Sequence, residues 1–294
     1  MISAAGWRLD SDRTLTLEPW CLMGILNVTP DSFSDGGVHF DSAHAVNSGV
    51  EMMRQGARVL DIGGESTRPG AAAVGIEEQI RRVVPVIEGL RQHPETSQVV
   101  VTIDTTRAAV AEAAFEAGAD AVNDVSAGTD PSEMFPLVAA GDRGLILMHR
   151  LRRPDQDSFS DRYEENPVYA DVVNDVRRWL AGRVAVAMQA GIHQDSIAVD
   201  PGLGFGKSVD QNHRLLAGLP ALISDGRPVL VGASRKSFLG AVTGISEPQD
   251  RDPESMVAAV EAWRRGARFF RVHNVGVHRR GLLVAAAVAS TRGS

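Results

Sequence analysis

Eight apolar stretches of the chain each end in polar or charged side chains, which could together bind a polar ligand. These side chains are Asn27, Asp61, Asp104, Asn123, Asp124, His149, Asp200, Ser234, Arg235, Lys236, Arg271 and His273. Buried charged groups are costly unless they are paired, so a convergent set of this size predicts a binding site. The alternative for any single member is that it caps a helix or pairs with a neighbour.

Four of these residues have the chemistry of a heterocycle pocket. Asp104, Asn123 and Asp200 offer acceptors, and Lys236 offers a donor. A carboxylate accepts two parallel N–H groups from a planar guanidine-like edge with bidentate geometry. We therefore expect this group to bind the edge of an amino-oxo heterocycle.

A second group is cationic or can become so. Arg68, Arg235, Arg271 and His273 suit the oxygens of phosphates. This group therefore predicts a phosphate subsite beside the heterocycle pocket.

The elements that must carry these residues are short apolar runs alternating with longer stretches of helical period. Strands are expected over residues 22–28, 59–62, 99–104, 121–125, 145–149, 197–200, 228–232 and 269–273. Helices are expected over residues 41–55, 76–92, 106–117, 168–190 and 254–265, among others. Such near-continuous apolar runs are typical of strands that are buried on both faces.

This alternation predicts an α/β fold, a single-domain (β/α)8 TIM barrel with its active site at the carboxyl ends of the strands. An open doubly wound sheet is the alternative, but no dinucleotide fingerprint follows the first strand. Residues 1–20 are expected to form an N-terminal cap segment, and residues 21–294 the barrel. The charged segment 150–167 is expected on the catalytic rim.

Composition excludes several classes of protein. The 294 residues are 44% apolar, enough for a sizeable core, and the net charge of −7 argues against a nucleic-acid partner. A single cysteine, Cys21, excludes an internal disulfide framework and a cysteine-clustered zinc site. No apolar run approaches the roughly 20 residues of a membrane span, and the first residues lack a signal peptide's apolar centre. We expect a cytoplasmic protein without a membrane partner.

Two further motifs that would indicate other functions are incomplete. The sequence PGLGFGKS over residues 201–208 is similar to a P-loop, but Pro201 stands where the first glycine belongs. The histidines form no HExxH pair, so a zinc hydrolase has little support.

Seven motifs together resemble the signatures of the dihydropteroate synthase family. They are MGILNVTPDSFSDGG (23–37), DIGGESTRPGA (61–71), TIDT (102–105), NDV (123–125), DPGLGFGK (200–207), VGASRKSFLG (231–240) and RVHNV (271–275). They occur in the family's order and span most of the chain. The resemblance implies a barrel that condenses 6-hydroxymethyl-7,8-dihydropterin pyrophosphate with p-aminobenzoate, giving 7,8-dihydropteroate and pyrophosphate.

The resemblance also implies a role for each matching residue. Asp104, Asn123, Asp200 and Lys236 would hold the pterin ring. The pyrophosphate would lie on Arg68, Arg271 and His273, with Thr67 close by, and Asn27 would help to place Mg²⁺. Phe33, Pro69 and Ser234 would contact the aminobenzoate, while loops 29–37 and 66–71 close over the site. The family further implies a homodimer formed through the last helices.

The implied chemistry is a dissociative substitution at the pterin's methylene carbon. Cations and Mg²⁺ would stabilise charge on the leaving pyrophosphate. The catalytic residues would be Asp104, Asp200 and Lys236, with the two carboxylates favouring a pterin cation. The neutral aryl amine is already a nucleophile, so no strong base is needed.

Two positions depart from the family's pattern. Arg150 stands where the family usually has Met, and Asn274 stands where it usually has Asp. A long cation beside the pterin pocket would change its shape and charge, unless residues 150–153 form a solvated loop face. A diverged synthase-like paralogue therefore stays open, as do a pterin-binding methyltransferase and a non-catalytic pterin-binding protein.

Overall fold

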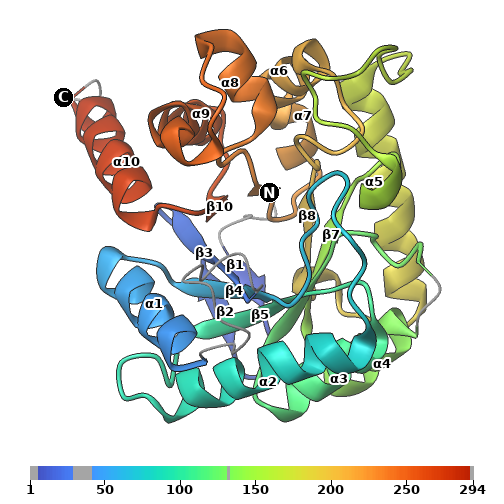
Figure 1. Ribbon diagram of the computed structural model, residues 1–294, viewed down its shortest axis with the longest axis vertical. Helices are drawn as coiled ribbons and strands as arrows, with labels where there is room; N and C mark the ends of the chain where they lie inside the picture. Colours follow the sequence, from blue (N-terminus) through green and yellow to red (C-terminus); the bar gives the residue numbers. More distant parts are fainter. Residues whose placement is uncertain (1–5, 29–41, 131–132, 292–294) are drawn as a thin grey trace.

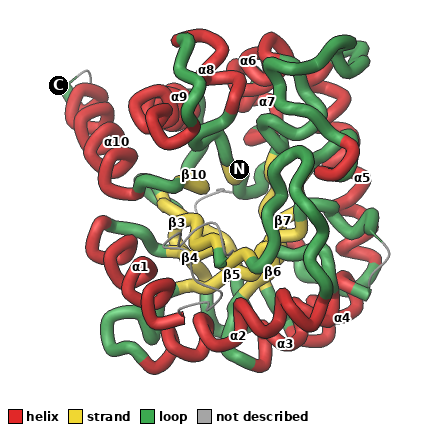
Figure 2. The backbone as a smooth tube through the Cα atoms, in the orientation of Figure 1, coloured by secondary structure: helices red, strands yellow, loops and turns green. Residues whose placement is uncertain are grey.

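A computed structural model describes residues 6–28, 42–130 and 133–291, and it forms a barrel of parallel strands (Figures 1 and 2). The strands are β3 (Cys21–Asn27), β4 (Val59–Gly63), β5 (Val100–Asp104), β6 (Ala121–Asp124), β7 (Gly144–Met148), β8 (Ile197–Asp200), β9 (Leu230–Val231) and β10 (Phe269–Val272). Their order in the sheet is β8-β7-β6-β5-β4-β3-β10-β9. A bridge between Val199 and Val229 brings β8 and β9 together. The predicted (β/α)8 barrel is confirmed.

Helices cover the outside of the barrel (Figure 1). They are α1 (Ser42–Gln55), α2 (Ile76–Gln92), α3 (Ala108–Glu116), α4 (Met134–Gly141), α5 (Val172–Gln189), α6 (Val209–Ala217), α7 (Leu219–Ile223), α8 (Ser237–Thr243), α9 (Asp252–Arg264) and α10 (Val275–Ser290). Short 3₁₀ turns lie at Pro154–Gln156, Gln194–Ser196 and Pro248–Arg251.

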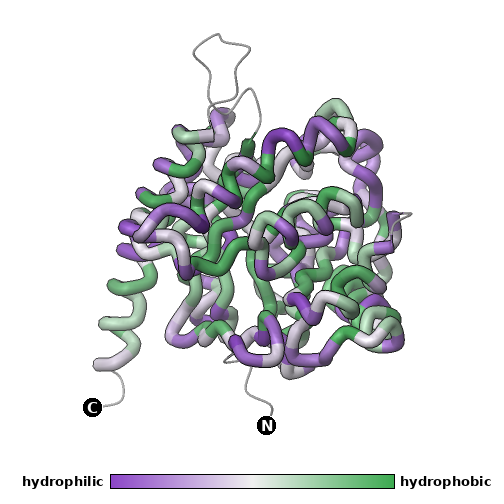
Figure 3. Tube along the Cα trace, turned by 90° about the horizontal axis from the view of Figure 1, so that it is seen from below, coloured by the Kyte–Doolittle hydropathy of each residue, from purple (hydrophilic) through white to green (hydrophobic). Residues whose placement is uncertain are grey.

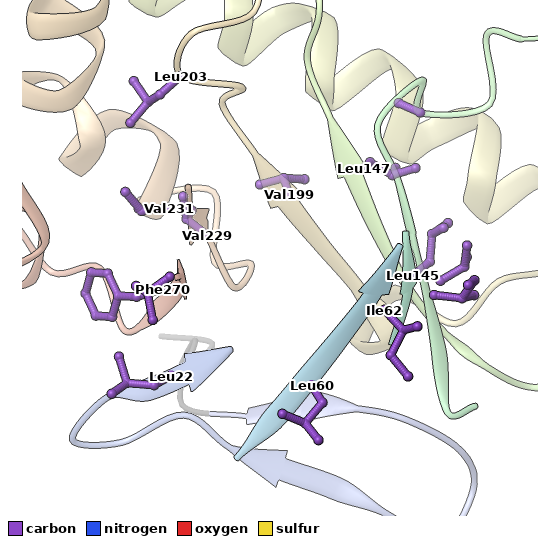
Figure 4. Packing of buried hydrophobic residues seen from close by; sticks show 14 of the residues in the cluster. Leu22, Leu60, Ile62, Leu145, Leu147, Val199, Leu203, Val229, Val231 and Phe270 are labelled. Atoms are coloured by element: carbon purple, nitrogen blue, oxygen red, sulfur yellow. The ribbon is translucent and has the colours of Figure 1, made fainter. Parts of the chain in front are cut away.

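The main core lies between the strands and this helical layer. Leu60 and Ile62 of β4 point outward from the barrel into it, and Phe270 of β10 belongs to the same cluster (Figure 4). Alternate residues along each strand therefore face the helices. The residues between them face the barrel interior, where the site is built.

An antiparallel hairpin closes the amino end of the barrel. It consists of β1 (Gly6–Arg8) and β2 (Thr14–Thr16). Trp7 is fully buried, packs 5.6 Å from the ring of Phe269 and donates from Nε1 to the Ser196 carbonyl at 2.8 Å. This hairpin fits the predicted N-terminal cap, although its core is continuous with the barrel's.

Several predicted element boundaries were wrong by one to four residues, and three of them have a clear local cause. Strand β9 is shorter than residues 228–232, because Pro228 has no N–H to donate to the ladder. Helix α5 begins at Val172 rather than residue 168, since the Asp171 side chain caps it by accepting from Val173 and Asn174. Helix α3 begins at Ala108, after Thr105 Oγ1 accepts from the Arg107 N–H.

Candidate active site

A pocket opens at the carboxyl ends of the strands and brings together most of the predicted site residues. Its lining includes nine of them: Asn27, Thr67, Arg68, Pro69, Ser234, Arg235, Lys236, Arg271 and His273. Asp104, Asn123 and Asp200 are buried among the strand ends at 6%, 2% and 5% exposure. Phe33 and loop 29–37 lie outside the described residues. The carboxyl ends of parallel strands meet at one face of the barrel, which is why residues so distant in sequence converge.

A buried network ties the strand ends together beneath the pocket. Asp61, fully buried on β4, accepts from Arg271 Nε at 2.5 Å, from Asn123 Nδ2 at 3.1 Å and from Thr102 Oγ1. Arg271 Nη2 also donates to Asp104 Oδ2 at 2.7 Å. The guanidinium of Arg271 thus bridges two carboxylates.

One oxygen of this network is left without a partner. Asp104 Oδ1 is buried and accepts no hydrogen bond from any residue that the structure describes. A buried acceptor without a donor costs about 1–3 kcal/mol. Such an atom is suited to accept an N–H group from a ligand.

Burial also shifts the titration of the predicted catalytic residues. It raises the pKa of Asp200 to about 6, although the Gly202 N–H at 2.7 Å and the charge of Lys236 oppose that rise. It raises the pKa of Asp104 against the opposing effect of Arg271. Burial and the charge of Arg271 together lower the pKa of Lys236 to about 8. Groups whose ionisation is this easily perturbed are typical of binding and catalytic sites.

Lys236 is held over an aromatic ring. Its Nζ lies 3.9 Å from the centroid of the Phe205 ring, close enough for a cation–π interaction. Gly204, at φ +81°, packs against the Lys236 stem, and a Cβ there would approach Lys236 Cδ to 2.9 Å. The segment 201–206 therefore needs glycine to bring its backbone beside this lysine.

Lys207 stabilises that segment from within. It is fully buried and donates to the carbonyls of Gly202 at 2.9 Å and Phe205 at 2.8 Å, while its Nζ lies 3.0 Å from His149 Nδ1. Burial and Lys207 lower the pKa of His149 to about 2, so the ring is neutral and accepts from the ammonium. No role was predicted for Lys207. His149 is a structural partner of Lys207.

The four residues of the predicted phosphate subsite differ in the charge they can offer. Arg68 is exposed in the pocket lining. Arg235 is paired with Asp252, with Nε 2.7 Å from Oδ1, so much of its charge is already neutralised. Arg271 is engaged by Asp61 and Asp104.

His273 is a neutral donor rather than a cation. Burial, together with Arg235 and Arg271, holds the pKa of His273 well below its usual range. The Ser234 hydroxyl accepts from the His273 backbone N–H at 3.1 Å and lies 3.0 Å from Nδ1. If the hydroxyl donates to Nδ1, the proton of the neutral ring lies on Nε2.

Both departures from the family's pattern have local structural partners. Arg150 forms a buried ion pair with Asp130 and is not part of the pocket lining. Asn274 caps α10 by accepting from the Val277 N–H at 3.1 Å and donates from Nδ2 to Asp252 at 2.8 Å. Arg150 therefore neither lines the pocket nor belongs to a solvated face, whereas residues 151–153 are exposed, as that alternative predicts.

Asp124 is also structural. It accepts from the Ser126 N–H at 2.8 Å and the Gly128 N–H at 2.7 Å, and so closes the turn after β6.

Asn27 is the candidate metal ligand in the pocket. Within the described ranges, histidine, cysteine, aspartate and glutamate side chains form no cluster of three or more that could hold a metal ion. Asn27 ends β3 and lines the pocket with its amide. Mg²⁺ commonly takes one or two protein oxygens and completes its shell with water and substrate phosphates, so a single amide oxygen fits a substrate-bound ion.

Among the described helices, none is long and apolar enough to span a membrane.

Comparison with known proteins identifies the family. The family described as "Pterin binding enzyme" matches residues 23–273. Dihydropteroate synthase of Streptococcus pyogenes serotype M1 is 42% identical over 255 residues, covering 86% of this chain and 90% of that protein. The structure of Xanthomonas albilineans dihydropteroate synthase with 4-aminobenzoic acid is 42% identical with a TM-score of 0.87, covering 97% of this chain and 98% of that chain. The same enzyme in complex with 7,8-dihydropteroate is 40% identical with a TM-score of 0.83, at the same coverage. The chain belongs to the dihydropteroate synthase family of pterin-binding enzymes.

Proposed function

We propose that this chain condenses 6-hydroxymethyl-7,8-dihydropterin pyrophosphate with p-aminobenzoate, giving 7,8-dihydropteroate and pyrophosphate. The observation that carries the proposal is the buried, unpartnered Oδ1 of Asp104 beneath a pocket that also presents Lys236. A pterin edge with N–H donors and a carbonyl complements this arrangement of acceptors and a donor. Asp200 and Asn123 would complete the contact with the ring.

The pyrophosphate would lie nearer the mouth. Arg68 and the Nε2–H of His273 are available there, with Thr67 beside them. Arg271 would contribute by sharing its guanidinium between Asp61, Asp104 and the substrate. A neutral histidine donates one hydrogen bond without adding charge, so the positive charge at the mouth would come from the arginines.

The reaction follows from this placement. The bond between the methylene carbon and the pyrophosphate oxygen breaks, and its electron pair leaves with the pyrophosphate. Ionised Asp104 and Asp200 favour the electron-deficient pterin that remains. The amine nitrogen of p-aminobenzoate then forms the new C–N bond and releases one proton to solvent. Lys236 would donate to the ring carbonyl and hold the ring in register.

Asn27 would hold Mg²⁺ together with oxygens of the bound pyrophosphate. The ion, when bound, would neutralise charge on the leaving group. This assignment predicts that Asn27→Ala raises the Mg²⁺ concentration needed for half-maximal rate. The matched control is Ser66→Ala, which also changes a polar side chain of the pocket lining.

The chain's last helices suit a homodimer. Val284, Leu283 and Val288 of α10 are 66%, 45% and 47% exposed, and Val257 of α9 is 55% exposed. Figure 3 shows α10 as mainly hydrophobic toward the C-terminal end. Light scattering on the purified chain would give twice the monomer mass, and Val284→Glu would lower it.

A cytoplasmic location is consistent with the single, buried and unpaired Cys21.

The proposed reaction is tested by supplying the dihydropterin pyrophosphate, p-aminobenzoate and Mg²⁺ to the purified chain and measuring dihydropteroate. Product that disappears in Asp200→Ala would support the proposal and exclude a contaminating enzyme. Binding of the pterin substrate without product would contradict it and favour the diverged paralogue.

A further inference from the structure

The loop after β7 contributes an aromatic side chain to the active-site pocket. Phe159 lines the pocket together with Pro69, Ser234 and Lys236. Residues 150–167 were predicted to form a charged loop at the rim, with no predicted binding role for Phe159. The rim position is correct, and Phe159 is the part of this loop that reaches inward.

The backbone beside Phe159 is fixed to two helices. The Ser160 N–H donates to Ser237 Oγ at 3.1 Å, at the start of α8. The Ser160 hydroxyl accepts from Asn212 Nδ2 of α6 at 3.0 Å, and Ser160 is only 4% exposed. These contacts bury the residue that follows Phe159, so the backbone that carries the ring is held in place before any ligand arrives.

Hydrogen bonds also join the 150–167 loop to two other loops at the pocket mouth. Asp157 accepts the Gly206 N–H at 2.8 Å, which joins it to the glycine-rich segment 201–206. The Gly70 N–H donates to the Pro154 carbonyl at 3.1 Å, which joins it to loop 66–71. The loop is therefore a fixed wall of the pocket, attached on two sides.

Among the described residues that line the pocket, Phe159 supplies the one phenyl ring. Lys236, Arg235 and Arg251 supply cations to the lining, whereas Phe159, Pro69 and Pro248 supply the apolar surface there. The Arg162 guanidinium lies 5.1 Å from the Phe159 ring centroid. A flat aromatic ring that carries a carboxylate complements an apolar wall among cations.

We propose that Phe159 is a specificity-determining residue of the acceptor subsite. In this role its ring contacts the aromatic ring of p-aminobenzoate and limits the bulk of aryl amines that the site accepts. The proposal rests on the proposed synthase function. It assigns to the β7–α5 loop a task that the pterin-binding residues do not share.

The test compares Phe159→Ala and Phe159→Leu with the wild-type enzyme. Loss of an aromatic contact and its buried surface predicts a rise of about ten-fold in KM for p-aminobenzoate in Phe159→Ala. Phe159→Leu keeps apolar surface and is expected to lie between the two. The Kd of the dihydropterin pyrophosphate, measured by calorimetry, is expected to stay within two-fold of wild type. The control is Leu151→Ala, on the same loop but 43% exposed and packed near Gly206.

The preference between two aryl amines distinguishes a direct contact of Phe159 with the substrate from a general structural role. If Phe159 limits bulk, Phe159→Ala raises the ratio of kcat/KM for a ring-methylated 4-aminobenzoate to that for p-aminobenzoate. An unchanged KM and an unchanged ratio would overturn the proposal. Equal weakening of pterin and aminobenzoate binding would also overturn it, because the loop would then be only a scaffold. Failure of the wild-type chain to make any dihydropteroate would instead contradict the synthase function itself.

Discussion

The two ends of the barrel are built from the same strands but satisfy their interior groups in opposite ways. At the amino end, Trp7 and Phe269 fill the interior with apolar surface, and the one polar atom of Trp7 has its hydrogen bond. At the carboxyl end, the interior holds Asp61, Asp104 and Asp200, and Asp104 Oδ1 accepts no hydrogen bond from the described part of the chain. The amino end is thus complete without a ligand, whereas the carboxyl end is completed by one. Stability and function are separated along the axis of one barrel.

The largest expected effect concerns the amino end. Trp7→Ala removes a fully buried indole and leaves a cavity, so the free energy of unfolding is expected to fall by about 3–5 kcal/mol. Below the new melting temperature, kcat/KM is expected to stay close to the wild-type value. Urea unfolding and steady-state kinetics on the same sample measure both. A large loss of kcat/KM in folded protein would break the division between the two ends.

A substitution at the carboxyl end, Asp200→Asn, is expected to lower activity and leave stability intact. Asp200→Asn keeps an oxygen that can accept the Gly202 N–H but removes the charge that faces the ligand. We expect kcat/KM to fall by about 100-fold or more. The melting temperature should hold or rise, because a buried carboxylate with a raised pKa is destabilising when ionised. Calorimetric melting together with kinetics tests this pair of outcomes, and a substantial drop in melting temperature would count against it.

The titration of Asp200 gives a pH signature at the same end. Its pKa near 6 in the free protein means that it loses its charge as the pH falls below that value. A pterin N–H edge binds the ionised form, so affinity is expected to fall up to ten-fold per pH unit below about 6. The probe is 6-hydroxymethyl-7,8-dihydropterin, which has no phosphates that would titrate in this range. Asp200→Asn should make the fall in affinity shallower without abolishing it, because Asp104, whose pKa burial also raises, still titrates. A flat wild-type profile would refute the role.

A smaller effect is expected for Arg150, which lies near the site without entering it. Arg150→Met leaves Asp130 buried and unpaired, so the free energy of unfolding should fall by about 1–3 kcal/mol. Turnover should stay within about two-fold, since the side chain is not part of the pocket lining. A clear gain in turnover would instead place the arginine in the path of the substrate.

The smallest effect is expected for Asn274→Asp, which restores the acid typical of the family. Aspartate caps a helix as well as asparagine does, but it would lose the donation from Nδ2 to Asp252 and place two carboxylates together. We expect a change of less than about 1 kcal/mol in stability and no measurable change in kcat/KM.

The sequence was enough to predict features that depend on where a residue lies along its own strand. Apolar runs located the strands, and the polar residues that end them located Asp104, Asn123, Asp200 and Lys236 at one face. It failed where the outcome depends on partners from distant strands. Nothing adjacent to Arg235 indicates that Asp252 takes its charge, because that pairing exists only after α8 and α9 pack together.

The same limit applies to Asp61 and Phe159. Asp61 is the anchor of Arg271, but its sequence neighbours do not show that β10 lies beside β3 in the closed barrel. Phe159 lies in a charged stretch, and the hydrogen bonds that hold the neighbouring Ser160 against α6 and α8 form only in the folded chain. Phe159 and Tyr163 are both aromatic residues of this rim loop, and nothing in the sequence indicates which of them lines the pocket.

The central claim is that the carboxyl end holds buried acceptors that a pterin edge completes. A crystal structure of the chain with the dihydropterin pyrophosphate tests it most directly. The account predicts ring N–H groups within hydrogen-bond distance of Asp104 Oδ1 and of Asp200, with the pyrophosphate toward Arg68 and His273. A pterin bound elsewhere, or one that leaves Asp104 Oδ1 without a partner, would contradict it.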